Sequence, residues 1–209
     1  MLKKVPQQER SRGAVAAILE AATRILGTRH LRETTTNQIA ALAGVGIGSL
    51  YQYFTSKEAI AQCLLEQHRH DSLLLADAVL REASGGVAER YRTMLRELLA
   101  LHERERMLHL NFIEAQGHAP PSDQLPDVRR HLDLLAQLLR DDQPQLDATS
   151  AALHAQVMMG SVHTLVHCTI QLEDPRRDGI ALEHYDAFVP EYCRSGPGSK
   201  RPNRGQAPI

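Results

Sequence analysis

The sequence is poor in aromatic residues and in cysteine, and it contains no tryptophan. Aromatic side chains make up 4% of its 209 residues. The three cysteines, Cys63, Cys168 and Cys193, are an odd number, lie far apart and form no Cys-x-x-Cys pair. A disulfide framework or a cysteine zinc site is therefore not expected, and a reducing cytoplasm is the expected location.

Long apolar runs are also missing. No stretch of about 18 apolar residues occurs, so no transmembrane helix and no membrane partner are predicted. The first ten residues lack the hydrophobic segment that a secretory signal needs. Alanine and leucine are abundant while valine and isoleucine clusters are few, which favours helices over strands. The expected fold class is therefore all-α.

The charge is balanced overall, at −1, but it is unevenly distributed. Residues 1–57 carry eight Lys and Arg against three acidic residues, a net +5. Residues 58–194 carry 13 basic against 22 acidic residues, a net −9, and residues 195–209 add +3. A basic head on an acidic body indicates a polyanionic partner for the head. Chance clustering of solvated charges accounts for the pattern equally well.

Apolar residues recur at helical spacing along most of the chain and predict about nine helices. A threonine run and a glycine bound a short helix from Thr35 or Thr36 to Gly44. Thr-Ser-Lys-Glu at 55–58 is a capping signal for a long helix. The other predicted helices span residues 12 to about 26, 47 or 48 to about 54, and approximately 57–83, 87–101, 107–117, 128–139, 148–172 and 180–193, the last one interrupted by Pro190.

The segment 35–58 has the spacing of a helix-turn-helix, in which Gly44-Val45-Gly46 joins two short helices. In such a unit the second helix enters the major groove of DNA and its N-terminal residues meet base edges. Those residues are Ile47, Gly48 and Ser49, and Gln52 is a further candidate for a base contact. A plain helical hairpin is the alternative.

Other polar residues in this segment suit contacts to the DNA backbone. The hydroxyls of Tyr51 and Tyr53 can donate to phosphate. Lys57 and Thr36 each stand at a helix N-terminus, where free N–H groups favour an anion. These contacts would set the register on DNA, and the groove contacts would set the sequence preference.

The same residues resemble the TetR family of one-component bacterial regulators. The matching strings are ILEAA at 18–22, TNQIA at 36–40, AGVGIGSLYQYF at 43–54 and SKE at 56–58. Gly46, Ile47 and His30 depart from the family's usual residues. Carried over by position, the resemblance implies DNA contacts from Thr36, Asn37, Ile47, Gly48, Ser49, Tyr51, Tyr53 and Lys57.

The resemblance also implies a homodimer and an inducer pocket in each C-terminal domain. The dimer would form through the helices at about 148–172 and 180–193. The first of these is apolar on most sides, as a helix buried on several sides is. Gly160 and Ser161 would allow a close approach of helices. The alternative is a central core helix of a monomer.

These observations divide the chain into four parts. Residues 1–11 are expected to be a flexible basic arm, 12–57 a helix-turn-helix DNA-binding domain, 58–194 a ligand-binding and dimerisation domain, and 195–209 a disordered tail. Candidate pocket residues are apolar or amphipathic side chains that would suit a small apolar ligand. They are Met94, Leu98, His102, Met107, Phe112, Gln116, Met158 and His163, each of which also fits an ordinary core position.

Histidines raise the question of a metal. His163 and His167 lie four residues apart on one helix face, which suits a metal ion, but no third ligand can be named. Packed or interfacial histidines are the preferred interpretation, and no metal or cofactor is predicted. His68 and His70, two residues apart, are expected to be exposed.

The sequence thus predicts a cytoplasmic, sequence-specific DNA-binding transcriptional regulator, as a repressor released from its operator by a small-molecule inducer. The alternatives are a DNA-binding dimer that answers to a protein partner or to no ligand, a metal sensor, and an enzyme. No Gly-rich phosphate loop, nucleophile motif or paired-carboxylate signature supports catalysis. Glu114 and His118 share a face, as many surface pairs do. The chain is therefore not expected to be an enzyme.

Overall fold

A computed structural model describes residues 9–116 and 123–194, and within these ranges the chain is helical with no strand. The elements are α1 (Glu9–Leu26), the 3₁₀ turn η1 (Leu31–Glu33), α2 (Thr36–Ala43), α3 (Ile47–Tyr53), α4 (Lys57–Glu82), α5 (Val87–Arg104), α6 (Arg106–Gln116), α7 (Pro126–Asp142), α8 (Ala148–Gln171) and α9 (Arg177–Arg194). The prediction of an all-α fold with three helices at the N-terminus is confirmed.

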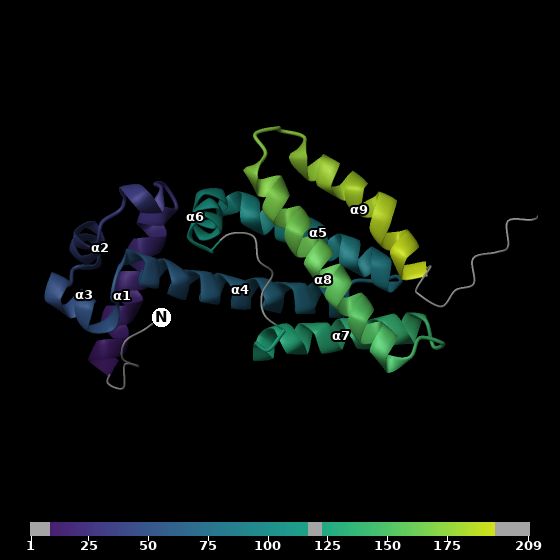
Figure 1. The fold of residues 1–209 in the computed structure, drawn as a ribbon. Coiled ribbons are helices and arrows are strands. Elements are labelled where there is room, and N and C mark those ends of the chain that lie inside the picture. The colour runs from purple at the N-terminus through teal and green to yellow at the C-terminus, as the bar shows by residue number, and fades with distance from the viewer. Residues whose placement is uncertain (1–8, 117–122, 195–209) are drawn as a thin grey trace, which may run out of the picture.

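Two groups of helices are joined by one long helix (Figure 1). Helices α1, α2 and α3 form a small head at one end of the molecule, and α4 runs from this head along the body. Helices α5, α7, α8 and α9 make up the rest of the body, while α6 lies beside both the head and α4. Helices α4 and α6 both pack against α1.

Local capping explains where the head helices begin and end. Thr35 caps α2: its hydroxyl accepts from the Gln38 N–H at 3.2 Å, and the Gln38 side chain accepts from the Thr35 N–H at 2.9 Å. Gly44 ends α2 with φ +67°, a left-handed conformation that glycine adopts without strain. Ser56 caps α4 through the Ala59 N–H. These caps agree with the predicted boundaries.

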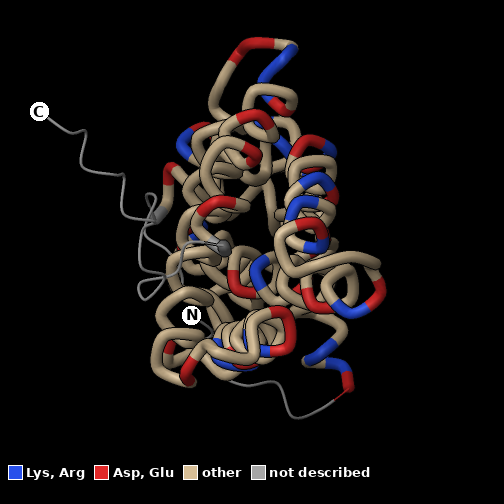
Figure 2. Tube along the Cα trace, turned by 90° about the vertical axis from the view of Figure 1, so that its right-hand side faces the viewer, with Lys and Arg blue, Asp and Glu red and all other residues tan. Residues whose placement is uncertain are grey.

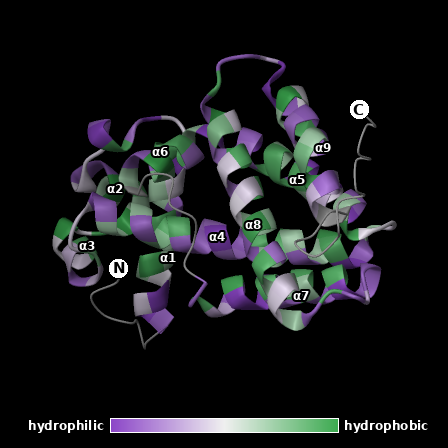
Figure 3. Cartoon of the chain, turned by 45° about the vertical axis from the view of Figure 1, so that its right-hand side comes forward, coloured by the Kyte–Doolittle hydropathy of each residue, from purple (hydrophilic) through white to green (hydrophobic). Residues whose placement is uncertain are grey.

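The head and the body have separate hydrophobic cores. Fully buried Ile18, Leu26, Ile39, Leu50 and Phe54 lie in the head core. Leu108 and Phe112 of α6 are also members of this core. The body core is formed by side chains of α4, α5, α7, α8 and α9. Figure 3 shows hydrophobic residues gathered where the helices face one another, and a largely hydrophilic connection between α8 and α9.

The structure corrects the predicted ends of two helices. Helix α1 begins at Glu9, so residues 9–11 are helical instead of belonging to the expected arm. Residues 1–8 of that arm, and the tail at 195–209, lie outside the described ranges. Helix α9 begins at Arg177 and runs through Pro190. Tyr185 and Val189 are buried in the body core, and this packing holds the helix together despite the N–H that proline lacks.

None of the helices in residues 9–116 and 123–194 is long and apolar enough to cross a membrane. Seen along the molecule from the body end, residues of both charge signs are spread over the outer turns of the helices (Figure 2).

Candidate functional site

The turn between α2 and α3 presents the start of α3 to solvent. Leu50 and Phe54 are fully buried against the head core, and they fix which face of α3 points inward. The opposite face carries the side chains predicted to meet base edges. Ile47 is 39% exposed, and Gly48, Ser49 and Gln52 are also exposed. A helix held from behind, with small and polar residues at its free N-terminal end, can be laid into a groove.

The residues predicted to contact phosphate divide into two groups. The Tyr51 hydroxyl lies 2.9 Å from the Thr36 hydroxyl, so these two side chains form one exposed polar site across α2 and α3. Asn37 is exposed beside them at the start of α2. Tyr53 is 9% exposed and packs in the head core. Tyr53 is thus a core residue whose ring helps to hold α3 in place.

Lys57 is engaged inside the protein. Its ammonium donates to the carbonyl oxygens of Leu31 at 2.7 Å, Arg32 at 3.2 Å and Thr34 at 2.9 Å. An ammonium group has three N–H donors, and three carbonyl acceptors match that number. Lys57 therefore joins the start of α4 to the η1 turn, which leads directly into α2.

Asn111 of α6, a residue that the sequence analysis did not single out, holds the same turn from the other side. It is fully buried, and its amide donates to the carbonyls of Leu26 at 2.8 Å and Arg29 at 2.9 Å. Its side-chain oxygen accepts from the Leu31 N–H at 2.7 Å. All these contacts join residues about 80 positions apart, so no local pattern could have revealed them. Helix α6 is thereby hydrogen-bonded to the head.

A cavity of about 660 Å³ lies between the head core and the body core. Phe112 lines it and belongs to the head core, whereas Met94 and Val162 line it and belong to the body core. This volume is within the range of small-molecule sites. Of the candidate pocket residues, the structure places five on the wall: Met94, Leu98, His102, Phe112 and His163.

The other candidate pocket residues are not on this wall. Met158 is buried in the body core, and Met107 is half-buried elsewhere on α6. The side chain of Gln116 lies outside the described part of the chain. The helical pattern placed Met158 on an inward face correctly, but a pattern does not tell a packed core from a cavity wall.

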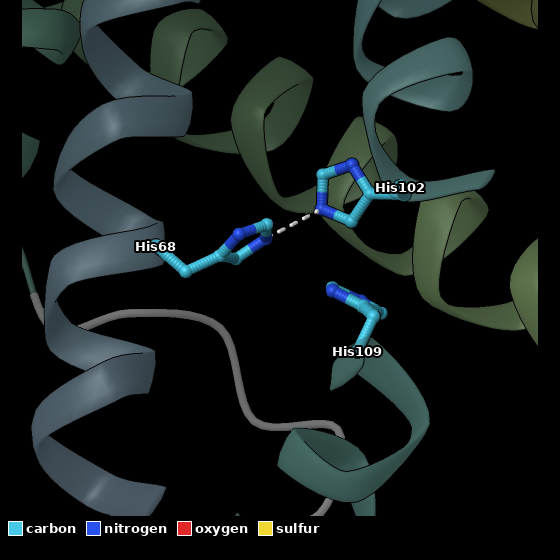
Figure 4. A group of neighbouring side chains, drawn as sticks. All are labelled: His68, His102 and His109. Carbon is cyan, nitrogen blue, oxygen red and sulfur yellow. Dashed lines mark hydrogen bonds between the residues drawn. The ribbon is translucent and has the colours of Figure 1, made fainter. Parts of the chain in front are cut away.

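Five histidines line one side of the cavity, and sequence reasoning identified two of them as pocket residues. They are His68 of α4, His102 of α5, His109 of α6, and His163 and His167 of α8. His68 was expected to be exposed, but its side chain is 10% exposed because α4 turns this face toward α5 and α6. Figure 4 shows that the rings of His68, His102 and His109 reach one common space from three different helices.

The surroundings keep these rings uncharged at neutral pH. Burial lowers the pKa of His68 to about 4. Burial, with the neighbouring His68, lowers the pKa of His102 to about 4. For His109, burial and then the adjacent histidines hold the pKa far below its usual range. Neutral imidazoles have a free lone pair on one ring nitrogen, so the cluster offers lone pairs to a ligand.

A buried ion pair supports the α4–α7 side of the cavity. Asp77 accepts from His131, a wall residue, at 2.8 Å and from Arg130 at 3.2 Å. Burial alone would raise the pKa of Asp77, but the hydrogen bonds and charges of His131 and Arg130 hold this pKa below its usual value. The two helices are thereby linked by a charge-assisted contact.

Comparison with known proteins agrees with this geometry. The model of a family described as bacterial regulatory proteins, tetR family, matches residues 18–63. The HTH-type transcriptional regulator TtgR of Pseudomonas putida is 38% identical over 71 residues, which are 33% of this chain and 34% of that protein. The HTH-type transcriptional regulator SAR0097 of Staphylococcus aureus is 29% identical over 103 residues, 48% of this chain and 53% of that protein. The match thus spans about a third to about half of these curated relatives.

Solved structures extend the similarity of the fold to nearly the whole chain. A TetR-family transcriptional regulator from Pectobacterium atrosepticum superposes with a TM-score of 0.70 at 19% identity, covering 94% of this chain and 100% of that chain. Fold and site together define a helix-turn-helix protein with an all-helical body. The helix-turn-helix part of the chain thus matches the tetR family of bacterial regulatory proteins, as the resemblance indicated, and the fold of the whole chain is similar to that of a TetR-family regulator. The matching family and these curated relatives are described as transcriptional regulators.

Proposed function

We propose that this protein is a cytoplasmic, sequence-specific DNA-binding transcriptional regulator that acts as a homodimer, and that it represses until a small molecule enters its cavity. One observation carries the proposal above the others. Helix α6 lines the cavity with His109 and Phe112, and with Asn111 it holds the η1 turn of the head. A ligand that shifts α6 therefore acts on the element that positions α2.

The DNA contacts that we propose follow from exposure. Ser49 and Gln52 stand free on α3 and are the candidates for base edges, with Ile47 and Gly48 allowing close approach. Thr36, Asn37 and Tyr51 form the exposed polar group at the start of α2 and are the candidates for phosphate. We assign Lys57 and Tyr53 to positioning, because their polar or aromatic groups are used within the head.

The dimer contact that we propose lies on α8 and α9. Leu153 of α8 is 52% exposed and Phe188 of α9 is 53% exposed, the two highest values among the exposed large apolar side chains of the described residues. Gly160 has open space where a Cβ would stand, so a second helix can approach α8 closely there. A second copy of the chain, with the same two faces, would cover these side chains.

The geometry of two heads explains how a ligand would control DNA binding. The heads of a dimer must present their α3 helices about 34–36 Å apart to reach successive turns of the groove. A ligand that favours another separation by about 1–3 kcal/mol weakens binding about 5- to 150-fold. The cavity wall combines apolar side chains with six histidines, Glu66 and Arg69, so we propose a largely apolar ligand that carries a polar group.

Fluorescence anisotropy tests the proposal directly. The purified protein is titrated onto DNA from upstream of its own gene and onto scrambled DNA, over a salt series. We expect tight, salt-sensitive binding with a preference for the native fragment. The exchange Tyr51→Phe removes the exposed hydroxyl and is expected to weaken binding to all DNA alike. Tyr185→Phe removes a hydroxyl that donates to the Ala88 carbonyl in the body, and serves as the matched control.

Two outcomes would contradict the proposal. Absence of a preference for any sequence, including sequences selected from random DNA, would rule out an operator-binding regulator. A thermal-shift screen that finds no stabilising small molecule would remove the inducer, since a ligand that binds the folded state must raise the melting temperature. The second result would leave a DNA-binding dimer that is regulated in another way.

A further inference from the structure

The arrangement of hydrogen bonds around His68 and His102 is unusual. The Nε2 atoms of these two rings lie 3.3 Å apart. The Nδ1 atom of His68 lies 3.2 Å from the Glu105 carboxylate, and the Nδ1 atom of His102 lies 2.6 Å from the Leu98 carbonyl. A carbonyl oxygen can only accept, so the Nδ1 atom of His102 carries the hydrogen and the Nε2 atom of His102 has a lone pair directed at His68.

With its hydrogen on Nε2, His68 donates to His102, whereas with its hydrogen on Nδ1, toward Glu105, the two Nε2 atoms present lone pairs to each other. The Ser72 hydroxyl lies 3.5 Å from His68 Nε2, at the limit for a hydrogen bond. In the second tautomer, the two facing lone pairs form a buried place where a cation can bind.

His109 supplies a third lone pair. It is 2% exposed, and neither of its ring nitrogens has a hydrogen-bond partner among the described residues. Its ring lies 4.2 Å from that of His102 and 5.4 Å from that of His68, measured between centroids. The ligating atoms of the three residues all lie within 4.8 Å of one another (Figure 4). A buried imidazole without any partner needs a physical explanation, and a ligand provides one.

We propose that His68, His102 and His109 bind a divalent transition-metal ion, with zinc as the typical case. Imidazole nitrogens bind Zn²⁺ at about 2.0–2.1 Å in tetrahedral geometry, which separates two ligating nitrogens by about 3.3 Å. The distance between the Nε2 atoms of His68 and His102 matches that separation. His109 closes the remaining gap by turning its ring, which no hydrogen bond holds in place.

The contacts behind the ligands fit the same assignment. Ligating histidines usually donate their second ring N–H to a carboxylate or a backbone carbonyl, which fixes the tautomer and the ring orientation. Glu105 and the Leu98 carbonyl take those two positions. Three histidine ligands leave a fourth coordination position, and all three rings line the cavity, so water or a donor atom of an organic molecule can fill it.

The site joins α4 and α6, which both contact the head, to α5 of the body. His68 stands on α4, whose first residue Lys57 holds η1, and His109 stands on α6 two residues before Asn111. An ion bound by both would fix α4 and α6 relative to α5. The effect of the metal on DNA binding rests on the proposed function, whereas metal binding itself does not.

The experiment measures Co²⁺ binding by full-length protein without an affinity tag, after treatment with a chelator and in the absence of DNA. Four-coordinate Co²⁺ absorbs visible light, so the spectrum reports the geometry as well as the stoichiometry. We expect one ion per chain, displaced by Zn²⁺, and a higher melting temperature with metal. His109→Phe keeps a buried ring of similar size and is expected to weaken Co²⁺ binding at least about tenfold.

A matched control and a second variant keep the test decisive. His154 is a fully buried histidine on α8, away from the cavity wall, and His154→Phe is expected to leave Co²⁺ binding unchanged. His102→Gln is expected to abolish the tetrahedral spectrum, with circular dichroism confirming the fold. The proposal is overturned if the wild-type protein binds no Co²⁺. It is also overturned if binding survives in both ligand variants, or is lost only when His163 and His167 are replaced.

DNA binding is then measured with and without Zn²⁺. If the metal is an effector, Zn²⁺ changes the affinity for the operator at least about fivefold in the wild type and not in His109→Phe. A protein that binds Co²⁺ as described but no DNA contradicts the proposed function and supports the metal site. A protein that binds its operator but no Co²⁺ supports the proposed function and contradicts the metal site.

Discussion

The head and the body are stabilised by contacts of different range. In the head, the polar contacts that shape the helix-turn-helix are short in sequence: Thr35 with Gln38, Ser56 with Ala59, and Thr36 with Tyr51. In the body, the polar contacts join helices more than 30 residues apart, as in His68 with His102 and Asp77 with His131. The helix-turn-helix is thus shaped by local caps, with Lys57 and Asn111 joining the head to α4 and α6, whereas the body keeps polar groups and a cavity inside.

This difference suggests a division of labour. A unit that reads DNA gains from a fixed shape, because base contacts require defined geometry. A unit that senses a ligand gains from a cavity and from polar groups that change partners when the ligand arrives. The two meet at η1, which Lys57 holds from α4 and Asn111 holds from α6.

Removal of the Asn111 contacts is expected to cause the largest loss of stability, and it tests whether α6 of the body holds the head. Asn111→Ala leaves the Leu31 N–H and the carbonyls of Leu26 and Arg29 without their partner in a buried place. We expect a loss of about 3 kcal/mol in the free energy of unfolding, measured by urea denaturation. Asn37→Ala, on the exposed start of α2, should change stability by less than about 0.5 kcal/mol. Equal effects would mean that α6 does not hold the head.

A variant of Lys57 distinguishes a positioning role of this residue from a contact to DNA phosphate. Lys57→Ala removes three hydrogen bonds to carbonyls and is expected to reduce stability by about 2 kcal/mol and to weaken DNA binding. The slope of log affinity against log salt should stay the same. A slope reduced by about 1 would show that Lys57 contacts phosphate after all. Arg32→Ala, whose side chain is 66% exposed, is the matched loss of one positive charge.

The contacts of Asp77 with His131 and Arg130 lie within the body, so a variant of Asp77 tests the stability of the body without changing a contact of the head. Asp77→Asn keeps the shape but weakens the contacts to His131 and Arg130, with an expected loss of about 2 kcal/mol at pH 7. The pKa of Asp77 is lowered in the fold, so its stabilisation is complete above the unfolded pKa of about 4 and is lost as the pH falls through the lower folded pKa.

Urea denaturation at pH 7 and near pH 3 checks the sign of this pH dependence of stability. The stability difference between the wild type and Asp77→Asn should shrink toward acid, while Asp133→Asn, on the exposed face of α7, should show little difference at either pH. A difference that grows toward acid would contradict the lowered pKa.

Ser49 is expected to have the smallest effect on stability and a specific one on DNA. Ser49→Ala on the exposed end of α3 should change the free energy of unfolding by less than about 0.5 kcal/mol. The preferred operator should change at one position, because a lost base contact is worth about 1–3 kcal/mol of discrimination. Selection from random DNA measures this, with Gln52→Ala as a second variant. An unchanged operator would remove Ser49 from the base contacts.

The sequence alone determined the helices and the helix-turn-helix of this protein. Segment 35–58 contains its own caps, its turn glycine and its inward apolar residues within 24 positions, so the local pattern predicted α2, Gly44 and α3 correctly. Five of the residues that line the cavity were predicted from the sequence, because helical spacing places them on the inward faces of α5, α6 and α8. Each of these features depends on neighbours within a few turns of one helix.

Tertiary structure decided which inward faces meet. It directed Lys57 to the carbonyls of η1, placed Asn111 under the head, and gathered His68, His102 and His109 from α4, α5 and α6. Helical periodicity tells which side of a helix is buried, but the partner on that side depends on how the helices cross. The physical reason is that packing joins residues about 30 to 85 positions apart, and a single sequence has no local signal for such pairs.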